Sequence, residues 1–209
     1  MRPFFSSLMV VGVICKPGPA IGGSYDDFFK ALQLDLAPTV ISLLSRGFDV
    51  NSIDPIRGDP ALVYAVRYES FKTLSLLVNA TDIKIDARAP NGDTALMVAA
   101  YNNAPEAVAL LLTSGAQPNR PGWTALHYAA AAGSVEIVRM LLEQSAYIDA
   151  EAPNKTTPLM MAARSGKTSV VELLIAEGAD QSLKNDNGMT AKDFAARFAD
   201  TTSLPGLYP

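Results

Sequence analysis

Three features of the sequence could support chemistry: a histidine, a cysteine and a segment similar to a phosphate-binding loop. His127 is the only histidine, and histidine can act as a general base or a metal ligand. A lone histidine cannot form a multi-histidine metal site. The segment Ser165-Gly166-Lys167-Thr168 lacks the glycine that a phosphate loop needs five residues before Gly166, where Met161 stands. We therefore expect no nucleotide, metal or cofactor.

The charge balance and the cysteine count exclude further classes of protein. The 209 residues include 17 Lys and Arg against 21 Asp and Glu, so the net charge is -4 and the pI is near 5.0. A nucleic-acid-binding protein needs a basic surface to meet phosphate groups, and we expect no nucleic-acid partner. One cysteine, Cys15, cannot form an internal disulfide framework or a thiolate metal cluster.

The N-terminal residues have the pattern of an export signal. Arg2 supplies a positive charge, residues 4–14 are apolar apart from two serines, and Ala20-Ile21-Gly22 has the small residues of a cleavage site. The apolar run is too short for a membrane-spanning helix, which needs roughly 20 residues. We therefore predict a signal peptide at residues 1–22 that is cleaved after Gly22.

Two other interpretations of this segment stay open. Acylation of the Cys15 thiol would make the chain a lipoprotein, although Ile14 stands before it where a small residue is usual. An uncleaved apolar N-terminus that packs on the domain would leave the protein in the cytoplasm.

A sequence pattern recurs along the rest of the chain. Thr124, Thr157 and Thr190 are each 33 residues apart, and Thr94 precedes Thr124 by 30. An apolar residue and a pair of alanines follow Thr94, Thr124 and Thr157 in register. An apolar stripe with the spacing Val-x-x-Leu comes next, beginning at Val108 in the first of these units. The chain is therefore an array of similar units.

Each unit predicts two short helices. The hydroxyl of Thr124 can cap the first helix, and Leu126 and Ala129 lie on one face of it. Ser134 precedes the second helix, which carries the apolar stripe. Gly115 and Gly178 can end second helices in the left-handed conformation. One pair of helices is too small to bury its apolar face, so stability must come from stacking on neighbouring pairs.

These recurring residues resemble the ankyrin repeat. The likeness covers about residues 25–200, with two divergent units before Thr94 and a truncated sixth unit that carries Lys192 at the usual leucine position. The resemblance implies an all-α fold, a solenoid of stacked helix pairs joined by short β-hairpin-like turns. We expect this domain at residues 23–200 and a flexible tail at residues 201–209.

The resemblance also implies a role for the histidine and shows one departure from the family pattern. In the sequence Thr-x-Leu-His, the ring of His127 is expected to hydrogen-bond the local backbone. The unit that begins at Thr94 lacks three residues before the next one, so residues 117–121 must form a shortened hairpin.

Ankyrin proteins usually meet their partners at a concave face, made of hairpin tips and the inner side of the first helices. By position in the repeat, the resemblance places exposed side chains at the hairpin tips and directly after the paired alanines. Asp59 and Thr156 are among those expected at the tips. Arginine, tyrosine and tryptophan are the types that dominate protein interfaces. The predicted partner-binding residues are Arg57, Arg67, Tyr68, Asp93, Tyr101, Asn102, Arg120, Trp123 and Arg164. Alternatively, Trp123 packs along its hairpin and the tyrosines shield helices.

The sequence thus predicts a non-catalytic module that binds another protein through a rigid concave face and is itself a monomer. The signal peptide followed by about five repeats is also similar to small exported ankyrin proteins of Gram-negative bacteria, which implies a periplasmic location. An inhibitor or immunity-type protein that blocks a toxin or an enzyme is an alternative within binding. An enzyme that uses His127 is the alternative of another class.

Overall fold

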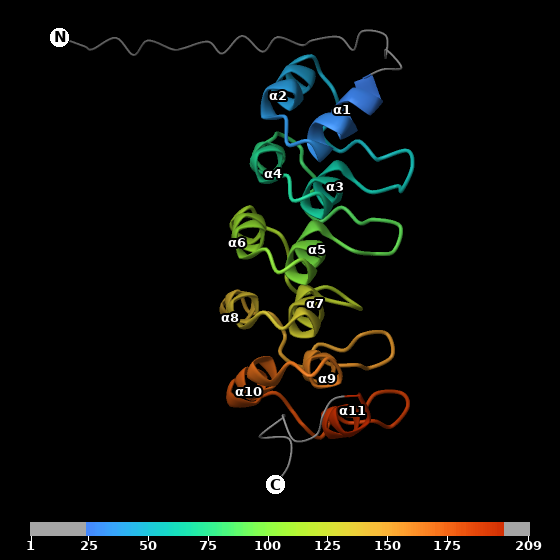
Figure 1. The fold of residues 1–209 in the computed structure, drawn as a ribbon, viewed down its shortest axis with the longest axis vertical. Coiled ribbons are helices and arrows are strands. Elements are labelled where there is room, and N and C mark those ends of the chain that lie inside the picture. Colours follow the sequence, from blue (N-terminus) through green and yellow to red (C-terminus); the bar gives the residue numbers. More distant parts are fainter. Residues whose placement is uncertain (1–23, 199–209) are drawn as a thin grey trace, which may run out of the picture.

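The computed structural model describes residues 24–198, which form eleven helices in one elongated stack (Figure 1). The predicted signal peptide at residues 1–22 and the predicted tail at residues 201–209 lie outside this part of the chain. The helices are α1 (Ser24–Gln33), α2 (Ala37–Ser45), α3 (Ala61–Arg67), α4 (Phe71–Val78), α5 (Ala95–Tyr101), α6 (Pro105–Thr113), α7 (Ala125–Ala132), α8 (Val135–Glu143), α9 (Pro158–Arg164), α10 (Thr168–Ala176) and α11 (Ala191–Phe198).

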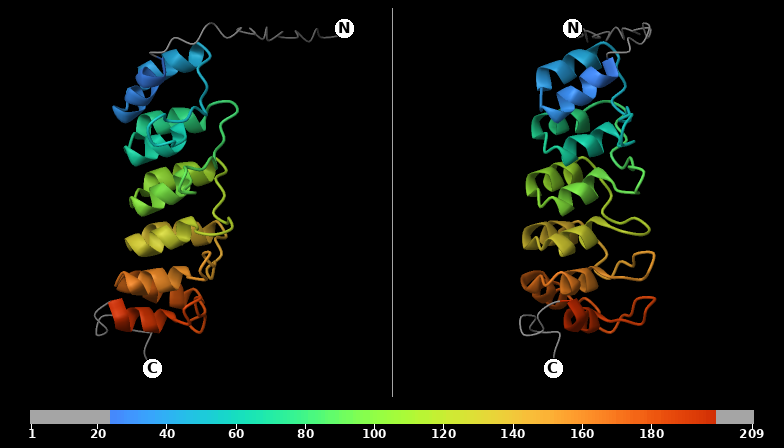
Figure 2. Two further views of the ribbon diagram at one scale, coloured as in Figure 1. Left: turned by 90° about the vertical axis from the view of Figure 1, so that its right-hand side faces the viewer. Right: turned by 45° about the vertical axis from the view of Figure 1, so that its right-hand side comes forward.

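The helices lie in two rows, and long loops project from one of them. The odd-numbered helices pack on one another along the stack to form the first row, and helices α2 to α10 with even numbers form the second. The loops that precede helices of the first row all point to the same side (Figure 2). We call them fingers, and they comprise residues 46–60, 79–94, 114–124, 144–157 and 177–190. The fingers and the first row together form the face that we call concave.

Between residues 24 and 198 the fingers contain turns rather than strands. The only β pairing there is an isolated antiparallel bridge between Ile53 and Pro60 in the first finger. The all-α fold with hairpin-like turns is therefore confirmed.

Side-chain caps begin the helices where the repeat pattern predicts them. The hydroxyl oxygen of Thr94 accepts the backbone N–H of Met97 at 3.4 Å, and Thr157 accepts that of Met160 at the same distance. In the second row, the hydroxyl oxygen of Ser134 accepts the N–H of Ile137 at 3.3 Å. These bonds satisfy N–H groups that the first turn of a helix leaves without a partner.

The ends of the second helices also follow the prediction. Gly115 and Gly178 have φ values of +91° and +94°, the left-handed conformation that glycine adopts without strain. Ser145 stands at the same position of the unit between them and adopts a φ of +61°. The turn is therefore kept even where the glycine is replaced.

The core runs along the stack between the two rows. Leu126, Ala129 and Leu141 are completely buried, and small alanines let the short helices approach closely. Because each helix pair contacts only its neighbours, burial of this apolar surface depends on the units above and below. Within residues 24–198, no helix is long and apolar enough to cross a membrane.

Hydrogen bonds connect every finger to the next one. In each case a side-chain oxygen of one finger accepts a backbone N–H from the following finger. We call this series the inter-finger ladder, and its acceptor and donor pairs are Asn51 with Lys84 at 2.8 Å, Asp86 with Gln117 at 3.1 Å, Asn119 with Tyr147 at 2.7 Å and Asp149 with Asp180 at 3.0 Å. The ladder fixes the spacing of the fingers.

The third finger is shortened, as its sequence predicts. Helix α6 ends at Thr113 and α7 begins at Ala125, whereas α8 ends at Glu143 and α9 begins at Pro158. The third finger is therefore three residues shorter than the fourth. Its position in the ladder is nevertheless kept, because Asn119 also donates its amide N–H to the carbonyl oxygen of Ser145 at 2.6 Å.

Candidate functional site

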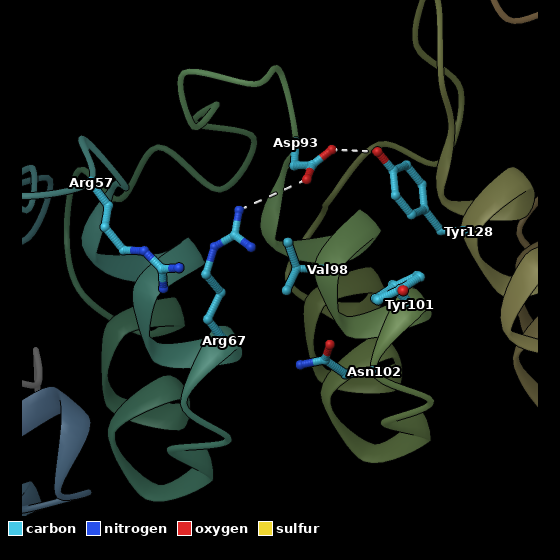
Figure 3. A pocket seen from close by; sticks show the side chains of 7 residues that line it. All are labelled: Arg57, Arg67, Asp93, Val98, Tyr101, Asn102 and Tyr128. Carbon is cyan, nitrogen blue, oxygen red and sulfur yellow. Dashed lines mark hydrogen bonds and ion pairs between the residues drawn. The ribbon is translucent and has the colours of Figure 1, made fainter.

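A pocket of about 300 Å³ opens on the concave face between the first two fingers and helices α3, α5 and α7. Figure 3 shows two guanidinium groups on one side of it and two tyrosine rings on the other. Its lining residues come from three successive units and are Arg57, Arg67, Asp93, Val98, Tyr101, Asn102 and Tyr128. Of the predicted partner-binding residues, the structure thus brings Arg57, Arg67, Asp93, Tyr101 and Asn102 together.

Two carboxylates hold Arg67 at the side of the pocket. Its Nε atom lies 2.8 Å from an oxygen of Asp59, and one of its terminal nitrogens lies 3.8 Å from Asp93. Asp59 and Asp93, which the repeat register predicts to be exposed at finger tips, are buried. Their carboxylates turn inward because they pair with Arg67 instead of with water at the finger tip. The predicted exposure of these two residues is therefore wrong.

Asp93 also fixes the ring of Tyr128. The Tyr128 hydroxyl donates to Oδ1 of Asp93 at 2.6 Å, and the amide of Asn91 donates to Oδ2 at 2.6 Å. Burial, followed by the hydrogen bond to Asp93, raises the pKa of Tyr128 well above its ordinary value. The ring of Tyr101 stands edge-on to that of Tyr128, with the centroids 6.1 Å apart. The aromatic side of the pocket is therefore fixed by contacts between two successive units.

Arg57 differs from Arg67 because its guanidinium makes no ion pair within residues 24–198. Its backbone is nevertheless fixed. The N–H of Arg57 donates to Oδ2 of Asp54 at 2.6 Å, and the N–H of Gly58 donates to the carbonyl oxygen of Asp54 at 2.8 Å. Arg57 thus extends an exposed, positively charged side chain from a rigid turn of the first finger.

The other predicted partner-binding residues lie outside the pocket. Tyr68 packs on the ring of Tyr64, with the centroids 4.5 Å apart. Arg120 pairs with Asp86 at 3.1 Å and so connects the third finger to the second. Arg164 lies exposed at the end of α9.

Trp123 is half-buried beside the histidine of the same unit. Its ring stands edge-on to that of His127, with the centroids 5.2 Å apart. This contact matches the alternative in which Trp123 packs along its hairpin.

Two residues of the pocket, Val98 and Tyr128, were not among the predicted ones. Each stands directly before the paired alanines of its unit. Side chains three residues apart on a helix share one face, so Val98 lies on the same face of α5 as Tyr101. Helical spacing around the alanines is therefore the signal that could have found both.

His127 has the structural position that its sequence context implies. The ring is completely buried, and the backbone N–H of Thr124 donates to Nδ1 at 3.2 Å. Because Nδ1 is an acceptor, the proton is assigned to Nε2, which lies 2.9 Å from the carbonyl oxygen of Thr156. Thr156, predicted to be exposed at a finger tip, is buried by this contact. Burial lowers the pKa of His127 to about 4, so the ring is neutral at pH 7.

The remaining sequence candidates for chemistry have ordinary positions. Gly166 lies in the turn between α9 and α10, with a φ of +64°. In the part of the chain that the structure describes, no three His, Cys, Asp or Glu side chains gather as metal ligands would.

Comparisons with known proteins agree with the repeating architecture. A family model described as "Ankyrin repeats (3 copies)" matches residues 28–122, 81–152 and 147–204. The human SH3 and multiple ankyrin repeat domains protein 2 is 31% identical over 172 residues, which are 80% of this chain and 9% of that protein. The human neurogenic locus notch homolog protein 4 is 44% identical over 77 residues, which are 35% of this chain and 4% of that protein.

The similarity also extends to a small protein. The Notch-regulated ankyrin repeat-containing protein of Xenopus tropicalis is 39% identical over 89 residues, which are 40% of this chain and 78% of that protein. In contrast, the chain spans less than a tenth of the length of the two human relatives.

Proposed function

The chain belongs to the ankyrin repeat family, whose members are generally non-catalytic protein-binding modules, and on this premise we propose that it binds another protein through its concave face. The observation that carries the proposal is the pocket of about 300 Å³ lined by Arg57, Tyr101 and Tyr128. Arginine and tyrosine are enriched among the residues that contribute most to binding energy at protein interfaces.

Exposed apolar side chains near the pocket support the same proposal. Tyr101 is 61% exposed, and Ile56, next to Arg57 in the first finger, is 90% exposed. Exposed apolar surface rimmed by polar groups is typical of interaction sites. A partner that covers these side chains would remove apolar surface from water at the place where Arg57 offers a polar contact.

The mechanism of binding in this proposal is that of a preformed surface. The inter-finger ladder fixes the fingers, and Asp93 fixes Arg67 and Tyr128. Because these groups are already ordered, little conformational entropy is lost when a partner binds. Affinity then depends on complementarity to the face and not on folding of the module.

A pair of tyrosine variants tests the proposal. Tyr101→Ala removes an exposed ring that lines the pocket, and Tyr147→Ala removes a ring that is 69% exposed but outside it. Tagged wild-type and variant chains are used to capture proteins from the cells that produce them, with quantification by mass spectrometry. We expect partners that wild type and Tyr147→Ala retain and Tyr101→Ala loses. Equal retention by all three chains would overturn the proposed role of the concave face.

We further propose that the chain is exported to the periplasm after cleavage of residues 1–22. Support comes from the sequence alone: the charge of Arg2, the apolar residues 4–14 and the small residues of Ala20-Ile21-Gly22. Mass spectrometry of protein from its natural host is expected to find an N-terminus near Gly23. An intact N-terminus at Met1 or Arg2 would refute export by cleavage, and a lipid-modified Cys15 would establish a lipoprotein instead.

A further inference from the structure

We infer that the pocket recognises an aspartate or glutamate side chain of a protein partner, which pairs with Arg57 while an adjacent apolar side chain contacts Ile56. The inference rests on the proposed function and deepens it, because it names the chemistry that the concave face selects. Three observations carry it: the charges around the pocket, the shape and polarity of its walls, and the exposed isoleucines of the first finger.

The charges around the pocket leave one guanidinium unpaired. Asp59 and Asp93 lie 2.8 Å and 3.8 Å from nitrogen atoms of Arg67 and so neutralise it. Asp54 is buried and accepts the backbone N–H of Arg57. The Arg57 side chain therefore stays exposed and is without an ion pair in the described structure. Guanidinium groups bind most strongly to planar anions that accept two parallel N–H groups.

The same charges favour an anion with a single negative charge. Arg57 and Arg67 stand against Asp54, Asp59 and Asp93, which together leave one negative charge in excess, so a phosphate group with nearly two negative charges would meet three carboxylates and only one unpaired cation. A carboxylate adds one charge and matches the one free guanidinium.

The walls of the pocket favour a side-chain carboxylate over the C-terminus of a partner. Protein C-termini are captured by nests of backbone N–H groups. Here, Arg57 supplies the unpaired donor from a side chain, and the ring of Tyr101 and the methyl groups of Val98 lie across the pocket from it (Figure 3). This apolar side suits the methylene groups of an aspartate or glutamate.

The isoleucines of the first finger extend the site beyond the pocket. Ile56 precedes Arg57 in the chain and is 90% exposed, and Ile53 in the same finger is 57% exposed. Burying such a side chain against a partner is favourable because it removes apolar surface from water. The structure therefore assigns to the partner a segment in which an acidic residue lies beside an apolar one.

Selection from a library of random peptides displayed on phage tests the inference on the full chain. We expect the enriched peptides to share an Asp or Glu beside an apolar residue. An enriched peptide is then measured by calorimetry against the wild type and three variants. Arg57→Glu reverses the charge in the pocket, Tyr101→Ala removes its aromatic wall, and Arg46→Glu changes an exposed arginine outside it. Thermal unfolding of each variant checks that it remains folded.

Loss of the ion pair at Arg57 is expected to weaken binding at least about tenfold, whereas Arg46→Glu should leave it unchanged. A peptide whose acidic residue is replaced by lysine should bind Arg57→Glu more tightly than the parent peptide does. Such a rescue requires direct contact between the two charges.

The remaining outcomes separate the inference from the proposed function. Enriched peptides that lack an acidic residue would overturn the inferred recognition of a carboxylate. So would peptides that bind Arg57→Glu as tightly as wild type but bind Tyr101→Ala more weakly. Both outcomes would leave the proposed binding through the concave face standing. Peptides whose affinity is changed neither by Arg57→Glu nor by Tyr101→Ala count against both proposals. A selection that enriches no peptide overturns the inference.

Discussion

Acid weakens the fold through His127, and the structure predicts by how much. The ring is completely buried, accepts the N–H of Thr124 and lies 2.9 Å from the carbonyl oxygen of Thr156. A proton on Nδ1 would break the first of these bonds and place a charge in the core. The pKa of His127 is accordingly lowered from 6.5 to about 4, and burial is the main cause.

The sign and size of the effect follow from this shift. Below pH 6.5 the unfolded chain binds a proton at His127 that the folded chain does not bind until the pH approaches 4. Stability is therefore fully present above pH 6.5 and is lost as the pH falls. Folded and unfolded pKa values of about 4 and 6.5 correspond to a loss of about 2 kcal/mol between pH 7 and pH 5 and about 3 kcal/mol by pH 4.

Urea unfolding at a series of pH values measures this loss. His127→Gln is the comparison, because glutamine cannot titrate but still offers an acceptor and a donor. Wild type should lose about 2 kcal/mol of unfolding free energy between pH 7 and pH 5, and His127→Gln should stay within about 0.5 kcal/mol of its value at pH 7. Hydrogen bonds lower the pKa values of Asp180 and Asp193 below 3.8, so these groups titrate beneath the window.

The comparison depends on the slope with pH and not on the absolute stability of the variant. His127→Gln can be less stable at every pH without affecting the test. If both proteins lose the same free energy between pH 7 and pH 5, the reasoning about the buried ring is wrong.

Two further predictions concern the core and the turns. Leu126→Ala should lower the unfolding free energy by roughly 2–5 kcal/mol, because the side chain is completely buried, and an unchanged melting temperature would contradict its position. Gly133→Ala and Gly115→Ala should each cost about 1–2 kcal/mol, because both residues have φ near +90°. The new Cβ at residue 133 would lie 2.7 Å from Cδ of Lys167, whereas a new Cβ at residue 115 would have no atom within 4 Å apart from those of its neighbours in the chain. Since the lysine side chain can move aside, similar losses are expected in urea unfolding, and a far larger loss for Gly133→Ala would show that Lys167 is held in place.

The repeating features of the fold could be predicted because each unit repeats the same local chemistry. Thr94, Thr124 and Thr157 stand in register, and each begins a helix of the first row. Gly115 and Gly178 end helices of the second row in the left-handed conformation. Such features depend on a few neighbouring residues, so the spacing along the chain is enough to find them.

The candidate site was less predictable because its side chains take their directions from other units. Asp93 turns inward to meet Arg67 of the unit before it and Tyr128 of the unit after it. Asp59 likewise pairs with Arg67 instead of facing water. Position within one repeat predicts which residues lie on the concave face, but the pairing between units decides which of them a partner can reach.

The inter-finger ladder has a mechanical consequence. Because its four bonds run from each finger to the next, a pulling force applied at the two ends of the stack loads them in series. Asn51 and Asn119 each anchor the following finger twice, through the side-chain oxygen and the amide nitrogen. The last finger is also anchored twice, because Oδ1 of Asp149 accepts the N–H of Asp180 and the carbonyl oxygen of Asn154 accepts the N–H of Asp186 at 3.1 Å. Asp86 likewise holds the third finger at two points, through the N–H of Gln117 and the guanidinium of Arg120, so under tension the load should be shared along the whole stack rather than concentrated at one end.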